Sequence, residues 1–273
     1  GMFNSVDVLC LLNLSNQSTG IYYFLTRNME INLIGQTALV TGAGKGIGKE
    51  TAILLAECGA SVIALSRTQG DLDSLKTQIP NVRTICADLI NLDEAIKAIQ
   101  LTDEHVDLLV NNAAYTVHKE NVLDLTEDDV NMAMKVNLTA PLRLSQIVAR
   151  DLIKRGAGGA IVNVSSIVSE RSCAKLSPYG MTKAALDNLT KTLAVELAPH
   201  KIRVNSILPA TTATPLIMKY YEAESIQAVM KRIPRGQMAD PKEIAHTIVY
   251  LLSDFASNIT GTQLVSDGGY FAN

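Results

Sequence analysis

The sequence predicts an α/β protein with a doubly wound parallel sheet that carries helices on both faces. Two observations indicate this class. From residue 37 to the C-terminus, short apolar runs typical of buried parallel strands alternate with segments of helical periodicity. A glycine cluster also stands between the first such strand and the first helix, which is the order of a Rossmann-type unit. Since neither a repeat nor a low-complexity linker divides the 273 residues, the alternation predicts one domain.

Each expected element follows from its own pattern. Strands are expected at the short apolar runs, residues 37–40, 60–65, 83–86, 106–110, 160–164, 203–208 and 262–265. Helices are expected where apolar residues recur every three to four positions, at residues 47–58, 72–78, 92–99, 127–155, 183–198 and 241–252. The long stretch 127–155 is expected to be interrupted near residues 137–141.

Composition excludes several classes of protein. With 47% hydrophobic and 19% charged residues the chain is not disordered, and a net charge of −3 without a Lys/Arg tract does not favour a nucleic-acid partner. The four cysteines and four histidines lack metal-ligand spacing, so no metal site is expected. Cysteines without a disulfide framework indicate reduced thiols and a cytoplasmic location. No apolar run is long enough for a membrane span.

The N-terminus stands apart from the alternating pattern. Residues 1–28 form an extension of unknown role, and residues 29–273 form the predicted domain. A secretory signal is not favoured, because the apolar stretch near the start lacks a basic region and contains Asp7. An extension without catalytic consequence and a targeting or subunit-contact segment both stay open.

The glycine cluster predicts a dinucleotide site. Gly42, Gly46 and Gly48 follow Thr41 with the spacing Gly-x-x-x-Gly-x-Gly, after a strand and at the start of a helix. Glycines let the backbone turn tightly and approach a pyrophosphate, and the helix N-terminus supplies N–H groups and a positive dipole. A glycine cluster alone would equally fit a structural turn, but this position in the first β-α unit favours a nucleotide.

The end of the second strand favours NADP(H). An NAD site usually places an acidic residue there to bind the ribose 2′-hydroxyl, whereas this strand ends at Ser66, Arg67 and Thr68. Arg67 could bind a 2′-phosphate bidentately, and Lys45 in the glycine cluster could add a second charge. The alternative is that both are ordinary surface cations.

A tyrosine and a lysine supply candidate proton chemistry. Tyr179 and Lys183 are four residues apart and lie on one face of a helix. A nearby ammonium favours the phenolate, which brings a phenol into the range of a useful acid or base. Ser166 follows a strand whose carboxyl end faces the expected cofactor crevice, where a hydroxyl could hold a carbonyl oxygen.

Jointly and in this order, these residues resemble the motifs of the short-chain dehydrogenase/reductase family. The resemblance runs from about Met29 to the C-terminus and rests on Thr41-Gly42-x-x-x-Gly46-x-Gly48, Asp88-Leu89, Asn111-Asn112-Ala113-Ala114, Asn137, Ser166, Tyr179-x-x-x-Lys183 and Pro209. It implies a single-domain Rossmann-type fold. Ala114 and Ala210 stand where the family has glycine; both are small, so only a local adjustment is expected.

The resemblance also implies roles for the matching residues. Ser166 rather than Ser165 matches the family serine, because that serine lies thirteen residues before the tyrosine. The implied catalytic set is Asn137, Ser166, Tyr179 and Lys183: the tyrosine donates a proton, the serine orients the carbonyl, the lysine binds the nicotinamide ribose and tunes the tyrosine, and the asparagine holds a proton-relaying water. Ser166 and Tyr179 would also bind substrate. The implied cofactor-binding residues are Gly42, Gly44, Lys45, Gly46, Ile47, Gly48, Ser66, Arg67, Thr68, Asp88, Leu89, Asn112, Ala113, Tyr179, Lys183, Pro209, Thr212 and Thr214. Asp88-Leu89 would cradle the adenine, and Asn112-Ala113 would line the ribose.

Within the family, the sequence is most similar to reductases that use NADPH to convert ketoses such as L-xylulose, or α-dicarbonyls such as diacetyl. The similarity is weaker around Lys175, Leu176 and the lid after Thr214. A reductase of 3-oxoacyl thioesters or other ketones on the same scaffold is the alternative, and a non-catalytic NADP-binding protein is a third possibility. The resemblance further implies a homotetramer with no nucleic-acid partner.

Overall fold

The computed structural model describes residues 30–117, 121–220 and 223–272. The expected N-terminal extension, residues 1–28, lies outside the described residues. Asn32–Asn273 forms a compact unit that contains every described helix and strand.

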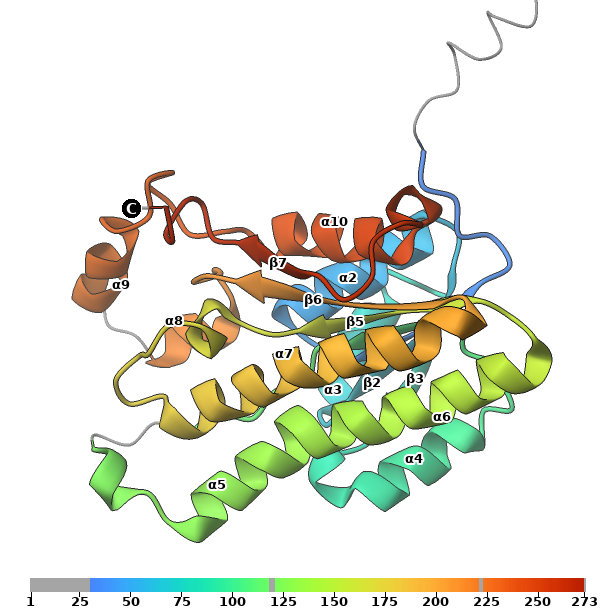
Figure 1. Cartoon of the computed structure of the whole chain (residues 1–273), viewed down its shortest axis with the longest axis horizontal. Coiled ribbons are helices and arrows are strands. Elements are labelled where there is room, and N and C mark those ends of the chain that lie inside the picture. The colour runs from blue at the N-terminus through green and yellow to red at the C-terminus, as the bar shows by residue number, and fades with distance from the viewer. Residues whose placement is uncertain (1–29, 118–120, 221–222, 273) are drawn as a thin grey trace, which may run out of the picture. The chain divides into compact units, whose positions relative to one another are not determined.

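A seven-stranded parallel sheet forms the centre of this unit, as the sequence predicts (Figure 1). The strand order is β3-β2-β1-β4-β5-β6-β7. Each strand lies within one or two residues of its expected position: β1 (Thr37–Thr41), β2 (Ser61–Ser66), β3 (Arg83–Cys86), β4 (Leu108–Asn111), β5 (Gly159–Val164), β6 (Ile202–Pro209) and β7 (Gln263–Ser266). The chain order reverses between β1 and β4, so the carboxyl ends of these two strands open the crevice where ligands bind in such sheets.

Helices cover both faces of the sheet. α2 (Gly46–Glu57) and α10 (Pro241–Leu252) pack together on one face, and α4 (Leu92–Gln100), α6 (Ala140–Arg155) and α7 (Ser177–Leu197) lie on the other (Figure 1). The remaining helices are α3 (Gln69–Lys76), α5 (Glu127–Met134), α8 (Pro215–Tyr220) and α9 (Ala223–Met230). Short helical turns complete the chain at η1 (Leu89–Asn91), η2 (Val122–Asp124), η3 (Lys135–Thr139), η4 (Ile167–Ser169), η5 (Ala198–His200) and η6 (Asp254–Ala256).

One helical expectation is confirmed and two need correction. The expected interruption near residues 137–141 is a π-helical turn, η3, which joins α5 to α6 without a break. Pro141 accounts for it, because it has no N–H to donate to the carbonyl of Asn137 one turn earlier. α7 begins at Ser177 rather than at residue 183, with Pro178 in its first turn, where proline is well tolerated. The pattern did not predict α8 and α9.

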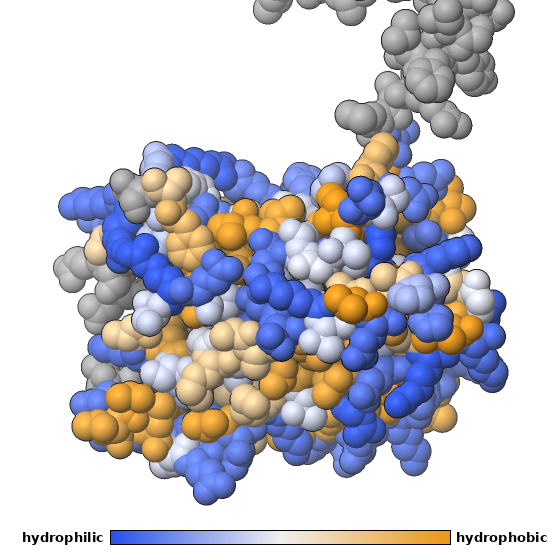
Figure 2. Space-filling view, in the orientation of Figure 1, coloured by the Kyte–Doolittle hydropathy of each residue, from blue (hydrophilic) through white to orange (hydrophobic). Residues whose placement is uncertain are grey.

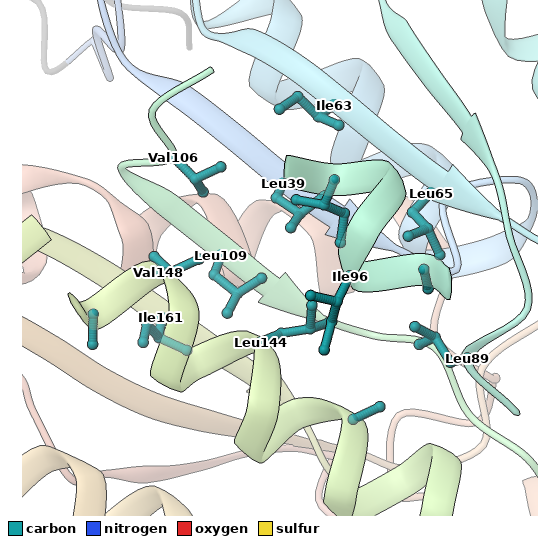
Figure 3. Close-up of a cluster of buried hydrophobic side chains, with 14 of the residues drawn as sticks. Leu39, Ile63, Leu65, Leu89, Ile96, Val106, Leu109, Leu144, Val148 and Ile161 are labelled. Carbon is teal, nitrogen blue, oxygen red and sulfur yellow. The ribbon is translucent and has the colours of Figure 1, made fainter. Parts of the chain in front are cut away.

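The core between the sheet and α4 and α6 is made of large aliphatic side chains (Figure 3). Leu39, Leu109 and Ile161 point from neighbouring strands toward Leu144 of α6 and Ile96 of α4. All five are at most 7% exposed. Strands buried on both faces hold the carboxyl edge of the sheet in one place, and that edge carries the residues discussed next.

The visible surface is mixed in character, with hydrophobic side chains gathered at one end, over η2 (Figure 2). Val122 and Leu123 are 60% and 85% exposed there. None of the described helices has the length and apolar character to cross a membrane.

Candidate active site

The glycine turn (residues 42–48) joins β1 to α2 and is tied to the end of β4. The Thr41 hydroxyl donates to the carbonyl of Val110 and accepts from the N–H groups of Asn112 and Ala113, at 3.0 and 3.1 Å. The Asn112 amide donates to the carbonyls of Thr41 and Gly42, at 2.9 and 3.2 Å. The two strands that flank the crevice are therefore locked together, and the Asn112 amide shapes the turn.

Close packing explains two of the glycines. Gly42 has a φ of +66°, which disfavours other residues. A Cβ atom on Gly48 would come within 2.3 Å of the Gly42 carbonyl oxygen and 2.4 Å of the Asn112 amide nitrogen. The absence of a side chain at Gly48 thus lets the start of α2 pack directly against the turn, as dinucleotide sites require.

The start of α2 fits a bound pyrophosphate. Lys45, the residue before the helix, makes no side-chain capping hydrogen bond, and the first turn contains no acidic residue. The first N–H groups of the helix are therefore free of side-chain caps and carry the positive end of its dipole. Ile47 is half-buried in this turn, and Gly44 is buried beneath it. These features suit a nicotinamide dinucleotide.

The end of β2 presents the expected cations unequally. Arg67 is exposed, and among the described residues no carboxylate pairs with its guanidinium. Lys45 pairs instead with Asp71 at 3.2 Å, so its charge is partly neutralised. Ser66 is buried against the turn, since a Cβ on Gly44 would lie 2.7 Å from its Oγ atom. Asp71 is a carboxylate near this site that the sequence analysis missed.

The remaining predicted cofactor residues surround the same crevice. The Asp88 carboxylate accepts from the N–H of Ile90 and caps η1, and Leu89 is buried. Pro209 ends β6, and the Thr212 hydroxyl donates to the carbonyl of Ala210 at 3.1 Å. The segment after β6 also approaches the glycine turn at Thr214, because a Cβ atom on Gly46 would lie 3.0 Å from the Thr214 methyl group. Thr68, at the start of α3, is exposed.

Tyr179 and Lys183 lie together at the start of α7. The Lys183 Nζ atom is 5.4 Å from the centre of the Tyr179 ring and donates to the carbonyl of Val164, the last residue of β5, at 2.6 Å. The lysine is only 2% exposed, whereas the tyrosine is half-buried. Burial lowers the pKa of Lys183 to about 8, and the Asp187 carboxylate opposes that shift. An ammonium in this position favours the phenolate form of the tyrosine.

The structure distinguishes the two serines after β5. Ser165 is 2% exposed, and its hydroxyl donates to the carbonyl of Lys183 at 3.4 Å. Ser166 is half-buried, and its Oγ atom accepts a weak hydrogen bond from the N–H of Val168. Ser166 is therefore the more accessible of the two hydroxyls.

Asn137 lies within the π-helical turn η3 and is fully buried. Its Oδ1 atom accepts from the N–H of Tyr115 at 2.7 Å, and its amide donates to the carbonyl of Tyr115 and the hydroxyl of Thr182. The Thr182 hydroxyl donates in turn to the carbonyl of Tyr179. The Asn137 side chain thus connects the loop after β4 to α7. Tyr115 and Thr182 were not found from the sequence, because only the fold brings them to this residue.

The structure therefore brings the predicted residues to one edge of the sheet, in two groups. The glycine turn and Arg67 lie at the ends of β1 and β2, whereas Ser166 and the Tyr179–Lys183 pair lie at the end of β5. In the described part of the chain, no group of three or more His, Cys, Asp or Glu residues could hold a metal ion.

Comparisons with known proteins agree on one family. A family model described as enoyl-(acyl carrier protein) reductase matches residues 42–271. L-xylulose reductase from Bos taurus is 46% identical over 89% of this chain and 100% of its own length. Carbonyl reductase [NADPH] 2 from Sus scrofa is 41% identical over 90% of this chain and 100% of its own length.

Two further matches widen the range of activities. NAD-dependent glycerol dehydrogenase from Listeria innocua is 35% identical over 88% of this chain and 96% of its own length. A crystal structure of a short-chain type dehydrogenase/reductase from Mycobacterium marinum has a TM-score of 0.83 and 33% identity, and covers 89% of this chain and 98% of that one.

Proposed function

We propose that this chain uses NADPH as its cofactor and a ketose or an α-dicarbonyl as its substrate. The chain belongs to the short-chain dehydrogenase/reductase family and is a carbonyl reductase of that family. The observation that carries the proposal is the buried Lys183 ammonium, 5.4 Å from the Tyr179 ring, at the strand end that faces the dinucleotide crevice. L-xylulose, which would yield xylitol, is a proposed test substrate in line with a relative's name, and diacetyl is the second proposed test substrate.

The proposed mechanism assigns the proton to Tyr179. NADPH, when bound, would supply the hydride that the carbonyl carbon receives. The Tyr179 hydroxyl gives its proton to the carbonyl oxygen as negative charge develops there, and the Ser166 hydroxyl holds that oxygen. The Lys183 ammonium binds the nicotinamide ribose and stabilises the phenolate that remains on Tyr179.

Asn137 is proposed to hold the water that returns protons to Lys183. Since its amide is already bonded to Tyr115 and Thr182, this role falls to its backbone carbonyl. Pro141 supports that assignment, because it has no N–H with which to occupy the carbonyl.

Arg67 supports the choice of NADPH over NADH. Its exposed guanidinium stands at the end of β2, where it could bind a 2′-phosphate through two charge-assisted hydrogen bonds. Lys45 contributes less, because it is paired with Asp71. The carboxylate of Asp71 weakens the expected preference for NADPH over NADH. One relative is named as NAD-dependent, so the assay compares both cofactors.

One alternative substrate class rests on a specific observation. Leu216 and Met218 of α8, in the lid after Thr214, are 48% and 60% exposed, and an apolar lid would suit the acyl chain of a 3-oxoacyl thioester. The description of the matching family model includes acyl carrier protein. A non-catalytic NADP-binding protein is the third possibility.

A homotetramer is proposed from the outer face of α7. Met181 and Val195 are 50% and 76% exposed on this helix. Closed two-fold contacts would cover such a face. Light scattering at micromolar concentration tests the assembly, and a monomer would refute it. The cytoplasmic location stays a prediction.

A panel of carbonyl compounds tests the proposed activity. L-xylulose, diacetyl and an acetoacetyl thioester are each supplied with NADPH or NADH, and the loss of nicotinamide absorbance is followed. The proposal expects turnover of L-xylulose or diacetyl with NADPH. Preferred turnover of the thioester would favour the alternative, and no turnover of any carbonyl would favour the non-catalytic protein.

A further inference from the structure

Lys183 and Asp187 are the two charged side chains that are buried among the described residues. They are 2% and 3% exposed, and both belong to α7 (Ser177–Leu197). Residues four apart lie on the same face of a helix, so Asp187 follows Lys183 one turn later on that face. Tyr179 stands one turn before the lysine, so the acidic residue lies on the other side of Lys183 along the helix.

The Asp187 carboxylate has no hydrogen-bond partner in the described structure, at either oxygen. Other buried polar groups nearby are paired: the Asn163 amide donates to the Thr190 hydroxyl, and that hydroxyl donates to the carbonyl of Leu186. Ser206 is paired in register with Asn163 on the neighbouring strand, and its hydroxyl also lacks a partner. The sheet therefore offers Asp187 no group that neutralises or solvates its charge.

Folding alone does not account for this residue. A buried carboxylate without a hydrogen bond destabilises the folded state, and an apolar or amide side chain of similar size would avoid that cost. Apart from Lys183, the other buried residues of α7 carry no charge: Pro178, Thr182, Leu186, Thr190, Leu193 and Ala194. The charge at position 187 therefore has a reason outside stability.

Lys183 supplies that reason. Its burial favours the neutral amine, which would bring no positive charge to Tyr179. The opposite charge of Asp187 favours the ammonium and raises the pKa that burial lowers. The carboxylate thus acts on the one group whose charge the proposed proton transfer requires.

We propose that Asp187 is a positioning residue of the active site, whose buried carboxylate holds Lys183 as an ammonium and so keeps Tyr179 able to exchange its proton. This inference rests on the proposed function, because it assigns Lys183 its role there. Asp187 acts through the lysine and has no contact with substrate or cofactor in this account.

No other buried charge competes for this role in the described part of the chain. Lys183 and Tyr179 are the titratable groups on the same helix face. On the elements packed against α7, the charged side chains stay toward solvent: Glu127, Asp128 and Asp129 of α5, Lys135 of η3, Arg143, Arg150, Asp151, Lys154 and Arg155 of α6, and His200 of η5. Arg203 of β6 donates to the carbonyls of Leu251, Leu252 and Ser253 at the far end of its strand.

A direct titration of Lys183 tests the proposal. Protein labelled with 13C at the lysine Cε atom is titrated by NMR, and the Lys183 signal is assigned by its loss in Lys183→Met. Removing an opposite charge should lower the midpoint by about one pH unit, from about 8 to about 7, in Asp187→Asn. Ser206→Ala is the matched control, because it removes another unpaired buried group at the same helix–sheet interface without changing charge. An Asp187→Asn midpoint equal to that of Ser206→Ala would overturn the proposal.

Turnover supplies a second readout. With a midpoint one unit lower, Asp187→Asn should reduce the carbonyl substrate about fivefold more slowly than the unmodified protein at pH 8, and at nearly the same rate at pH 6. An equal loss at both values would indicate a structural defect and would contradict the proposal. Should the unmodified protein reduce no carbonyl, the proposed function fails, and the NMR midpoints still decide whether Asp187 supports the ammonium.

A measurement on the unmodified protein covers the case in which Asp187→Asn does not fold. The 13Cγ chemical shift of Asp187, in protein labelled at aspartate, should be that of a carboxylate at pH 7. The shift of a carboxylic acid would overturn the proposal, because a neutral group cannot hold an ammonium.

Discussion

The glycine turn (residues 42–48) and the tyrosine–lysine turn (residues 179–183) meet the same crevice but are built in opposite ways. In the glycine turn, shape decides the residues: Thr41 and Asn112 hold the backbone by hydrogen bonds, and Gly48 leaves no room for a Cβ atom. In the tyrosine–lysine turn, charge decides them, since Lys183 is buried beside an unpaired Asp187. One region is organised to bind a ligand, and the other is organised to change the acidity of a phenol.

Replacing Lys183 should produce the largest effect, because it belongs to both functions. Lys183→Met keeps the length of the side chain but removes the charge beside Tyr179. We expect kcat for carbonyl reduction to fall by about two to four decades and NADPH affinity to fall with it. Steady-state kinetics and NADPH titration measure the two losses. A variant that retains normal kcat would show that the comparison between the two turns is wrong.

The same lysine should make stability depend on pH. Because burial lowers the pKa of Lys183 to about 8, the unfolded chain binds the lysine proton more tightly than the folded chain does. The free energy of unfolding should therefore rise between pH 8 and about 10.5, by about 3 kcal/mol, relative to Lys183→Met. Urea unfolding of both proteins across this range measures the difference. Parallel pH profiles would contradict the lowered pKa of Lys183.

Arg67→Ala tests the charge at the edge of the glycine turn. Losing one charge-assisted contact costs roughly 1.5–3 kcal/mol, so the KM for NADPH should rise by about one to two decades, and NADH kinetics should barely change. Lys45→Ala should have a smaller effect, because Lys45 is paired with Asp71. Equal use of NADPH and NADH by the unmodified protein would refute the assignment of Arg67.

Gly48→Ala tests shape without charge. The added Cβ atom would come within 2.3 Å of the Gly42 carbonyl oxygen, so the turn must shift. Overpacking of this kind costs roughly 1–3 kcal/mol, which predicts about a tenfold loss of NADPH affinity or a matching loss of stability. Gly70→Ala is the matched control, because a Cβ atom there meets nothing within 4 Å. If both variants bind NADPH as tightly as the unmodified protein and are equally stable, the turn accommodates a Cβ atom at position 48, and the packing argument is wrong.

The contrast between the two turns also explains what the sequence could predict. The strands and the glycine turn were found from short-range patterns, since apolar runs and glycine spacing follow directly from burial and backbone approach. The interruption of the long helix near Asn137 was predicted too, but the start of α7 was not, because a proline usually ends a helical pattern, whereas Pro178 lies in the first turn, where proline is tolerated.

The partners of the site residues were the least predictable feature. Asp71 neutralises part of the Lys45 charge. The N–H of Tyr115 donates to the Asn137 side chain, although the two residues are 22 positions apart in the sequence. Asp187 looks like an ordinary exposed helix residue in the sequence, and only the packing of α7 on the sheet shows that it is buried. Side chains that act through a neighbour leave no motif of their own.

The kcat of Tyr179→Phe isolates the proposed proton transfer, because this change removes one hydroxyl and keeps the ring beside Lys183. We expect a folded protein with nearly unchanged NADPH affinity and a kcat at least two decades lower, since a positioned acid contributes roughly two to four decades. A Tyr179→Phe protein that keeps more than about a tenth of the kcat would contradict the assignment of Tyr179 as the proton donor.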